Sequence, residues 1–526
     1  MDHDERRRKI LRSTLEVTVP TAASRILGYV RDLLQAFYLG TGPAADAFTI
    51  AYTIPNLLRR LTAEGALTPA FVPVFTRVQG ERSREETWRF ASRAFFDLAL
   101  VVFGLVVLGL VFAPGIVRVI AFGFRGDPGK QALTLQLTRV MFPYLLFVSL
   151  AALAGAILNS RRRFFVPAST PVLFNVAFIA AALLAAGRSA NPALVFAWGV
   201  VAGGVLQLII QLPFLVKEGM TFRFGASFRD PDLRRVARLM VPGLFATGLY
   251  QVNFALSRIL ASVLPQGSAA SLYYSSRVEE LALGLFSIAL ASVLLPTLAE
   301  QASSRDHPGL KSTLTFSLKL VFVATLPAAA GLLALSRPIM EVLFKRGEFG
   351  ASSAAMTSGC LVFFAAGLPF LAAVKILSTA FFSLEDTRTP VFIGLVVMAA
   401  YLGLSVILMG PLEVRGLALA LSLSQVLNVL LLFGALERKL GPIPKLGFLG
   451  SFFKGAAAAA VMGVAVRLFF EAVHRGPTGT LRQAGELGAS IVLGVGLYLI
   501  LLLLFDRRDA RALRALVSSR PPGARP

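Results

Sequence analysis

Long apolar stretches constrain the fold of this chain more than any other feature. A bilayer core about 30 Å thick is crossed by a helix of about 20 apolar residues, and the sequence holds about 14 stretches of that kind. Hydrophobic residues make up 56% of the 526 residues and charged residues only 15%, with a mean hydropathy of +0.72. Because a soluble domain has a different balance, we predict an all-α polytopic membrane protein.

The predicted spans follow one another with short connections. They cover residues 12–38, 45–76, 93–116, 132–158, 166–187, 193–216, 237–263, 270–299, 313–336, 353–382, 390–410, 414–436, 449–471 and 486–505. The longest polar stretches are 217–236 and the tail after Asp506, so we expect no large soluble domain. The opening MDHDERRRK does not resemble a cleaved signal peptide, and we expect it on the mature protein.

The net charge of +23 is concentrated in every second loop. The clusters are Arg6 to Lys9; Arg82, Arg84 and Arg89; Arg161 to Arg163; Arg229, Arg234 and Arg235; Arg305 and Lys311; Arg388; Arg438, Lys439 and Lys445; and Arg507, Arg508, Arg511 and Arg514. By the positive-inside rule these loops are cytoplasmic, which predicts an inner-membrane protein with an even number of helices and both termini in the cytoplasm. Nucleic-acid binding is not needed to explain the charge.

A weak self-similarity recurs about 222 residues along the chain. TVPTAAS from Thr18 resembles MVPGLFAT from Met240, and GALTPAFVPVF from Gly65 resembles IALASVLLPTL from Ile288. Chance similarity between apolar helices is the alternative explanation. A true repeat with an even number of helices gives two parallel lobes. We therefore predict an N-lobe at 1–220 (helices 1–6), a C-lobe at 221–440 (helices 7–12), and a C-terminal helix pair with a basic cytoplasmic tail at 441–526.

Groups of charged residues lie within the first, second and eighth predicted spans. They are Arg25, Arg31 and Asp32 in the first span, Asp46, Arg59, Arg60 and Glu64 in the second, and Arg277, Glu279 and Glu280 in the eighth. An ionised side chain at mid-bilayer costs roughly 2.5–3.5 kcal/mol on insertion scales, so we expect this set to face a hydrated cavity. The alternative is that these charged residues extend to the membrane surface or pair only with one another, for example Arg31 with Asp46.

Helical spacing indicates how these charges are arranged. Arg25 and Asp32 are seven residues apart, which places them on one face, whereas Arg59 and Arg60 cannot both face one cavity. The arginines outnumber the acidic groups available to neutralise them, which leaves room for an anionic ligand. Arginine suits a diphosphate, since its planar fork donates two parallel hydrogen bonds and keeps its charge when desolvated.

The run SRILGYVRD…ADAF…IPNLLRRLTAEGALTPAFVPVF, within about residues 20–80, resembles the N-terminal motif of the MurJ (MviN) lipid II flippases. YYSSR…E and DTRTP (Asp386 to Pro390) resemble later patterns of the family. The resemblance implies the multidrug/oligosaccharidyl-lipid/polysaccharide exporter fold with a cationic central cavity. It also implies movement of lipid II, the undecaprenyl diphosphate that carries the disaccharide-pentapeptide, from the cytoplasmic to the periplasmic leaflet by alternating access.

The resemblance also suggests roles for individual residues. The expected substrate-binding residues are Arg25, Arg31, Arg59, Arg277 and Asn56, and the expected acidic partners in the cavity are Asp32, Asp46 and Glu280, to which we add Glu64. Pro55 and Asn56 would form a helix-breaking pair. The last two helices, after about residue 447, would form a groove for the polyprenyl tail.

No metal or cofactor is expected from the sequence. Cys360 is the single cysteine, and the histidines His3, His307 and His474 are far apart. Some members of the family are thought to bind sodium among the later helices, but here 391–410 contains no Asp, Glu or Asn. Because a hard cation prefers oxygen ligands that include a carboxylate, we expect the membrane potential to drive transport instead.

Two alternatives remain open at this point. An exporter of another polyprenyl-linked oligosaccharide would use the same carrier chemistry. A polytopic glycosyltransferase would need a carboxylate pair or metal motif near a loop, and only Glu385 with Asp386 comes close. We expect that pair to cap a cytoplasmic turn, so we predict a transporter and no enzyme.

Overall fold

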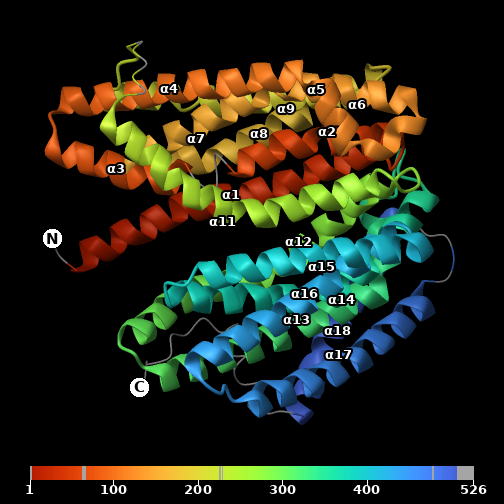
Figure 1. Cartoon of the computed structure of the whole chain (residues 1–526). Coiled ribbons are helices and arrows are strands. Elements are labelled where there is room, and N and C mark those ends of the chain that lie inside the picture. Colours follow the sequence, from red (N-terminus) through yellow and green to blue (C-terminus); the bar gives the residue numbers. More distant parts are fainter. Residues whose placement is uncertain are drawn as a thin grey trace. The chain divides into compact units, whose positions relative to one another are not determined.

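The computed structural model describes residues 3–61, 67–223, 225, 227, 229–474, 476 and 479–505. Within these ranges every regular element is a helix, which confirms the predicted all-α class (Figure 1). Ten helical segments of the described chain are long and apolar enough to cross a membrane. Each predicted span overlaps one helix or two consecutive helices, in the predicted order.

The first half of the chain forms α1 to α10. Their bounds are α1 (His3–Leu39), α2 (Pro43–Arg59), α3 (Thr68–Glu81), α4 (Arg84–Val111), α5 (Ala113–Ile120), α6 (Pro128–Met141), α7 (Tyr144–Ser160), α8 (Phe165–Ala185), α9 (Pro192–Ile209) and α10 (Leu212–Glu218), with short 3-10 helices η2 (Phe122–Gly126) and η3 (Ala186–Arg188). Several predicted spans are therefore split in two, as at Pro143 between α6 and α7.

The second half forms α11 to α18. Their bounds are α11 (Pro231–Ala261), α12 (Ser268–Ser303), α13 (His307–Phe344), α14 (Ala351–Ser383), α15 (Arg388–Leu412), α16 (Val414–Leu440), α17 (Lys445–Val473) and α18 (Thr480–Phe505). The bounds of α13 include a kink, because Leu335 has non-helical dihedral angles of φ −110° and ψ 15°.

Polar side chains fix where several helices begin. Ser83 accepts a hydrogen bond from the Glu86 N–H, and the Glu86 carboxylate accepts one from the Ser83 N–H, which together form a capping box at α4. Asp127, Asp230 and Asp306 cap α6, α11 and α13 in the simpler way. Each of these three is followed at the first or second helical position by a proline.

The chain divides into two compact units. Unit 1 consists of Met1–Ala270 together with Arg346–Phe349, and unit 2 of Ser271–Lys345 with Gly350–Pro526. The helix α11 groups with unit 1, where it packs on α2 and α3. The lobe boundaries predicted above concern an internal repeat rather than contacts, and they stay a prediction.

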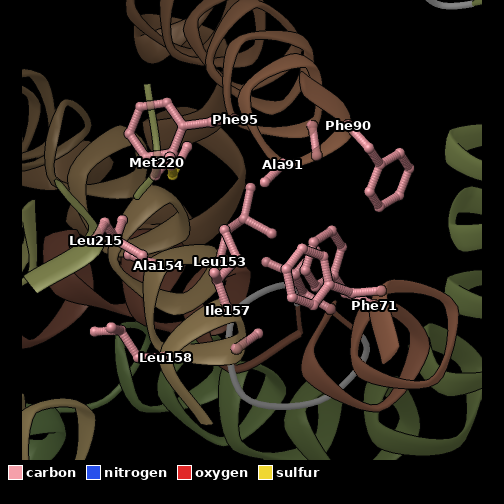
Figure 2. Close-up of a cluster of buried hydrophobic side chains, with 14 of the residues drawn as sticks. Phe71, Phe90, Ala91, Phe95, Leu153, Ala154, Ile157, Leu158, Leu215 and Met220 are labelled. Atoms are coloured by element: carbon pink, nitrogen blue, oxygen red, sulfur yellow. The ribbon is translucent and has the colours of Figure 1, made fainter. Parts of the chain in front are cut away.

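Aromatic and aliphatic side chains from α3, α4, α7 and α10 build a core in unit 1 (Figure 2). Phe71 and Phe90 stack with their ring centroids 5.9 Å apart and their planes 7° apart. Leu153 and Ile157, four residues apart on α7, lie in the same cluster. Side chains that interdigitate in this way fix α7 against its neighbours.

Candidate functional site

The guanidinium of Arg31 is held by bonds from two helices of unit 1. Its Nε and Nη2 donate to Oδ1 of Asp32 at 3.0 and 2.7 Å, and its Nη1 donates to Oδ1 of Asn175 at 3.2 Å. The rings of Phe174 and Phe178 lie 5.9 Å from the guanidinium carbon. Asp32 is 3% exposed, so the ion pair lies largely in the interior. An arginine held on three sides in this way has a fixed orientation, which is what preorganises a guanidinium for directional hydrogen bonds.

Asn175 connects α8 to the backbone of α1. Its Nδ2 donates to the Ser24 carbonyl at 2.9 Å and approaches Ser24 Oγ at 3.4 Å. A Cβ at Gly28 would lie 3.5 Å from the same Nδ2, so glycine at this position lets the amide lie close to the helix. Asn175 was not among the predicted site residues, although it is the one amide side chain within the α8 sequence.

Arg25 differs from Arg31 in its surroundings. It is exposed, and among the side chains that the structure describes it makes no ion pair. Asp32, seven residues along and predicted on the same face, is buried against Arg31. Unit 1 therefore carries at Arg25 a cation that the neighbouring carboxylate does not neutralise.

The helix α2 does not break at Pro55 and Asn56, so that expectation is wrong. The helix continues to Arg59, and π-helical turns begin at Arg60. Asn56 is instead a partner of Arg59, since its Oδ1 accepts from Arg59 Nε at 3.3 Å and Nη2 at 3.1 Å. Glu64, the remaining acidic residue predicted here, lies outside the described residues.

Two further arginine contacts link α2 to α11. Arg60 Nη1 donates to Oε1 of Gln251 at 3.2 Å, and Arg258 Nη1 donates to Oγ1 of Thr53 at 3.2 Å. Arg258 was not among the predicted site residues, although an arginine within the largely apolar run NFALSRILAS is a signal of the same kind. An alanine at Arg60 would therefore remove a contact to α11.

Asp46 has different partners from those expected of a cavity carboxylate. Its Oδ2 accepts from Lys130 Nζ and from the Gly267 N–H, both at 2.8 Å, and its Oδ1 accepts from the Ala270 N–H at 3.0 Å. Lys130 Nζ also lies 4.0 Å from the ring centroid of Phe124. Asp46 thus neutralises a buried lysine and caps the start of α12, which corrects both its assignment to the cavity and its alternative pairing with Arg31.

In unit 2, Arg277 is bonded within α12. Its Nη1 donates to Oε2 of Glu280 at 2.7 Å, and its Nη2 lies 3.4 Å from the hydroxyl of Tyr273, over whose ring it also sits. The Glu280 side chain is 41% exposed, whereas the adjacent Glu279 is buried. The predicted arginines are therefore divided, with Arg25, Arg31 and Arg59 in unit 1 and Arg277 in unit 2.

The motif DTRTP forms a helix cap. Oδ1 and Oδ2 of Asp386 accept from the Thr389 N–H at 3.0 Å and the Thr389 hydroxyl at 2.8 Å, and Oδ2 also accepts from Lys439 Nζ at 2.9 Å. The Lys439 bond, aided by the bonds from Thr389, lowers the pKa of Asp386 to about 2. The expected cap is therefore seen at Asp386, while Glu385 lies in the turn before it with a left-handed φ of 57°.

Comparison with known proteins identifies the family. The family model for the lipid II flippase MurJ matches residues 35–483. A probable lipid II flippase MurJ of Vibrio cholerae is 34% identical over 95% of this chain and 97% of its own length. A lipid II flippase MurJ of Burkholderia cenocepacia is also 34% identical, over 86% of this chain and 89% of its own.

The chain belongs to the MurJ family. A solved MurJ structure in an inward closed conformation has a TM-score of 0.79 and 26% identity, and covers 94% of this chain and 99% of its own. A multidrug resistance MATE family transporter of the MOP superfamily, solved in an inward-facing conformation, has a TM-score of 0.65 and 13% identity, covering 85% of this chain and 98% of its own. That second likeness concerns the fold alone.

Membership in the MurJ family makes this chain a membrane protein and a relative of transporters. Within the described residues no group of three or more His, Cys, Asp or Glu side chains is placed to hold a metal ion. The arginines of α1 and α2 remain the feature that most needs a chemical explanation, because arginine is expensive in apolar surroundings unless it has a task there.

Proposed function

We propose that this chain is a lipid II flippase that moves the undecaprenyl-diphosphate-linked precursor of peptidoglycan from the cytoplasmic to the periplasmic leaflet. Family membership supports this function, and the relatives named above are lipid II flippases by name. The observation that carries the proposal is that α1 holds two arginines in different surroundings. Arg31 is oriented by Asp32 and Asn175, whereas Arg25 is exposed and makes no ion pair among the described side chains. Such a pair suits a diphosphate, whose charge matches and whose oxygens accept from the guanidinium fork.

The proposed mechanism is alternating access of an arginine-lined site. Arg25, Arg31, Arg59 and Arg277 would bind the diphosphate. Asn56 would orient Arg59. Release on the other side needs no bond to be made or broken, so the scheme requires no covalent step. Asp32 and Glu280 would limit the net charge of the site, so that the substrate can leave.

The test is complementation of a strain depleted of its own lipid II flippase, with protein abundance measured in the membrane. Replacement of Arg25, Arg31, Arg59 or Arg277 by alanine should abolish growth while the protein stays abundant. Lysine at the same positions should impair transport wherever the contact is bidentate, because lysine keeps the charge but loses the fork. Growth of all the alanine variants at normal abundance would remove the main support for diphosphate binding.

An arginine outside the proposed binding site provides a matched control. Arg89 lies at the exposed start of α4, 3.0 Å from Glu85, and its side chain is 50% exposed. Such surface pairs contribute little to stability, so Arg89→Ala should support growth. Loss of growth in that variant as well would indicate a general effect of lost positive charge.

We further propose that the membrane potential drives transport and that both termini lie in the cytoplasm of a cell with this chain in its inner membrane. The alternating basic loops support that orientation. In proteoliposomes, flipping should continue when sodium is replaced by another monovalent ion and should stop when the potential collapses. Reporter tags at residues 2 and 526 should report cytoplasm, and tags at 125 and 475 periplasm.

A further inference from the structure

Two prolines inside α13 release two of its carbonyl groups. Proline has no N–H, so the residue four positions earlier receives no helical hydrogen bond from it. Pro327 releases the carbonyl of Val323 in this way, and Pro338 releases that of Ala334. The backbone bends at the second of these points, where Leu335 leaves the helical region. An unsatisfied carbonyl in apolar surroundings is costly, so each needs another donor.

Both donors come from the C-terminal helix pair. The hydroxyl of Tyr498 in α18 donates to the Val323 carbonyl at 2.9 Å, and Nη1 of Arg467 in α17 donates to the Ala334 carbonyl at 3.4 Å. Tyr498 is 3% exposed and Val323 is 2% exposed, so the first bond is fully enclosed. The two proline-released carbonyls of α13 are thus each matched by a side chain from a different helix of the pair.

Close packing accompanies these two bonds. The helices α17 and α18, blue in Figure 1, both pack on α13. A Cβ at Gly463 of α17 would lie 3.4 Å from the Ala330 carbonyl of α13, and a Cβ at Gly455 would lie 3.5 Å from the Tyr498 hydroxyl. Small residues at these positions let the helix backbones approach, which is how helices associate in lipid.

We propose that Tyr498 and Arg467 are positioning residues that dock the C-terminal helix pair onto the two proline sites of α13, so that α13, α17 and α18 move as one body. Each proline thus does more than bend the helix, because it leaves a carbonyl group that can accept a hydrogen bond from another helix. Any conformational change that shifts α13 then carries the C-terminal pair with it, at a fixed register set by two hydrogen bonds. The proposal concerns the fold of unit 2 and does not depend on the substrate.

A double-mutant cycle tests this reading, because it predicts that the effect of one substitution depends on the other. In the full-length protein, Cys360→Ala removes the single cysteine, and spin labels are placed on the exposed positions Phe316 of α13 and Val495 of α18. Tyr498→Phe should increase about threefold the population in which the two labels are farther apart. That factor corresponds to the free energy of an average interhelical hydrogen bond in a membrane.

In the Pro327→Ala background, Tyr498→Phe should change the distance distribution no further. The alanine supplies the missing N–H, which bonds to the Val323 carbonyl within α13 and takes the place of the Tyr498 hydroxyl. An equal effect of Tyr498→Phe in both backgrounds, or no effect in either, would overturn the proposal. Arg467→Met and Pro338→Ala form the corresponding cycle, with the second label at Val464 of α17.

Thr325→Val is the matched control. Its hydroxyl is buried in α13 two residues from Val323, but it donates to the Val321 carbonyl of the same helix at 2.7 Å. Removing it should leave the distance between α13 and α18 unchanged. A change as large as that of Tyr498→Phe would mean that any lost hydroxyl in α13 loosens the pair, and the proposal would fail.

Discussion

The guanidinium of Arg31 and the side-chain amide of Asn175 are hydrogen-bonded at 3.2 Å across 144 positions of sequence. Asn175 is a neutral acceptor, so it orients Arg31 without cancelling more of its charge than Asp32 already does. Different substitutions at Asn175 can therefore change either the orientation of Arg31 or the net charge around it.

Substitutions at Asn175 should separate these two properties by experiment. Asn175→Asp keeps an acceptor but adds a negative charge beside Arg31, so lipid II flipping in proteoliposomes should fall strongly at normal abundance. Asn175→Leu removes the bonds to Arg31 and Ser24, and should lower the free energy of unfolding by about 0.6–1.7 kcal/mol. If Asn175→Asp transports as the unaltered protein does, the charge at Arg31 is irrelevant to the substrate.

The buried pair of Asp46 and Lys130 should be coupled in stability. Asp46→Ala leaves an uncompensated lysine that is 9% exposed, and we expect a loss of about 3–5 kcal/mol, seen as lower thermal stability and abundance. Adding Lys130→Met should recover part of that loss, because no buried charge then remains. Additive losses in the double variant would contradict the pairing.

Two glycines between helices should not tolerate a side chain. Gly40 and Gly347 have φ of 55° and 58°, and a Cβ would lie 2.3 Å from the Glu348 and Phe37 carbonyl oxygens respectively. Gly40→Ala and Gly347→Ala should each reduce thermal stability by more than 1 kcal/mol, about the cost of strain at such a position. Gly115→Ala is the control, since a Cβ there meets nothing within 4 Å.

The Asp386 cap predicts a pH dependence at the N-terminal end of α15. Its pKa is about 2 in the folded protein and 3.8 ordinarily, so its contribution to stability is present above about pH 4 and lost as the pH falls toward 2. Because Lys439 is 42% exposed, we expect a contribution of only about 1 kcal/mol. Thermal unfolding of Asp386→Asn should show less change across that pH window than the unaltered protein.

The sequence predicts local relationships better than distant ones. Arg277 and Glu280 are one helical turn apart, a spacing at which side chains on a helix meet. Asp32 was expected on the face of Arg25, and it instead pairs with the adjacent Arg31. Asp46 was misjudged because its partner, Lys130, comes from another helix and its other partners are backbone N–H groups. No spacing rule reveals a contact of that kind.

Neutral groups account for the rest of what was missed. Asn175 carries no charge. The carbonyl that Pro327 releases has its donor in Tyr498, which comes 171 positions after the proline. A search for buried charges could have found Arg258, which lies in an apolar run, but not the two hydrogen-bonded carbonyls of α13. The apolar stretches were enough to predict the order of the helices, since each must cross or line the bilayer on its own.

The four residues Arg346–Phe349 belong with unit 1 although α13 and α14 on either side belong to unit 2, and the Glu348 N–H donates to the Phe37 carbonyl at 2.9 Å. The polypeptide therefore passes from one unit to the other at three places along its length rather than at one. Cleavage after Ala270 would give a first fragment that holds most of unit 1. The second fragment would still contain the segment Arg346–Phe349, which belongs to unit 1. Coexpressed halves divided at that point are thus expected to copurify as a noncovalent pair, whereas either half alone would carry an incomplete unit.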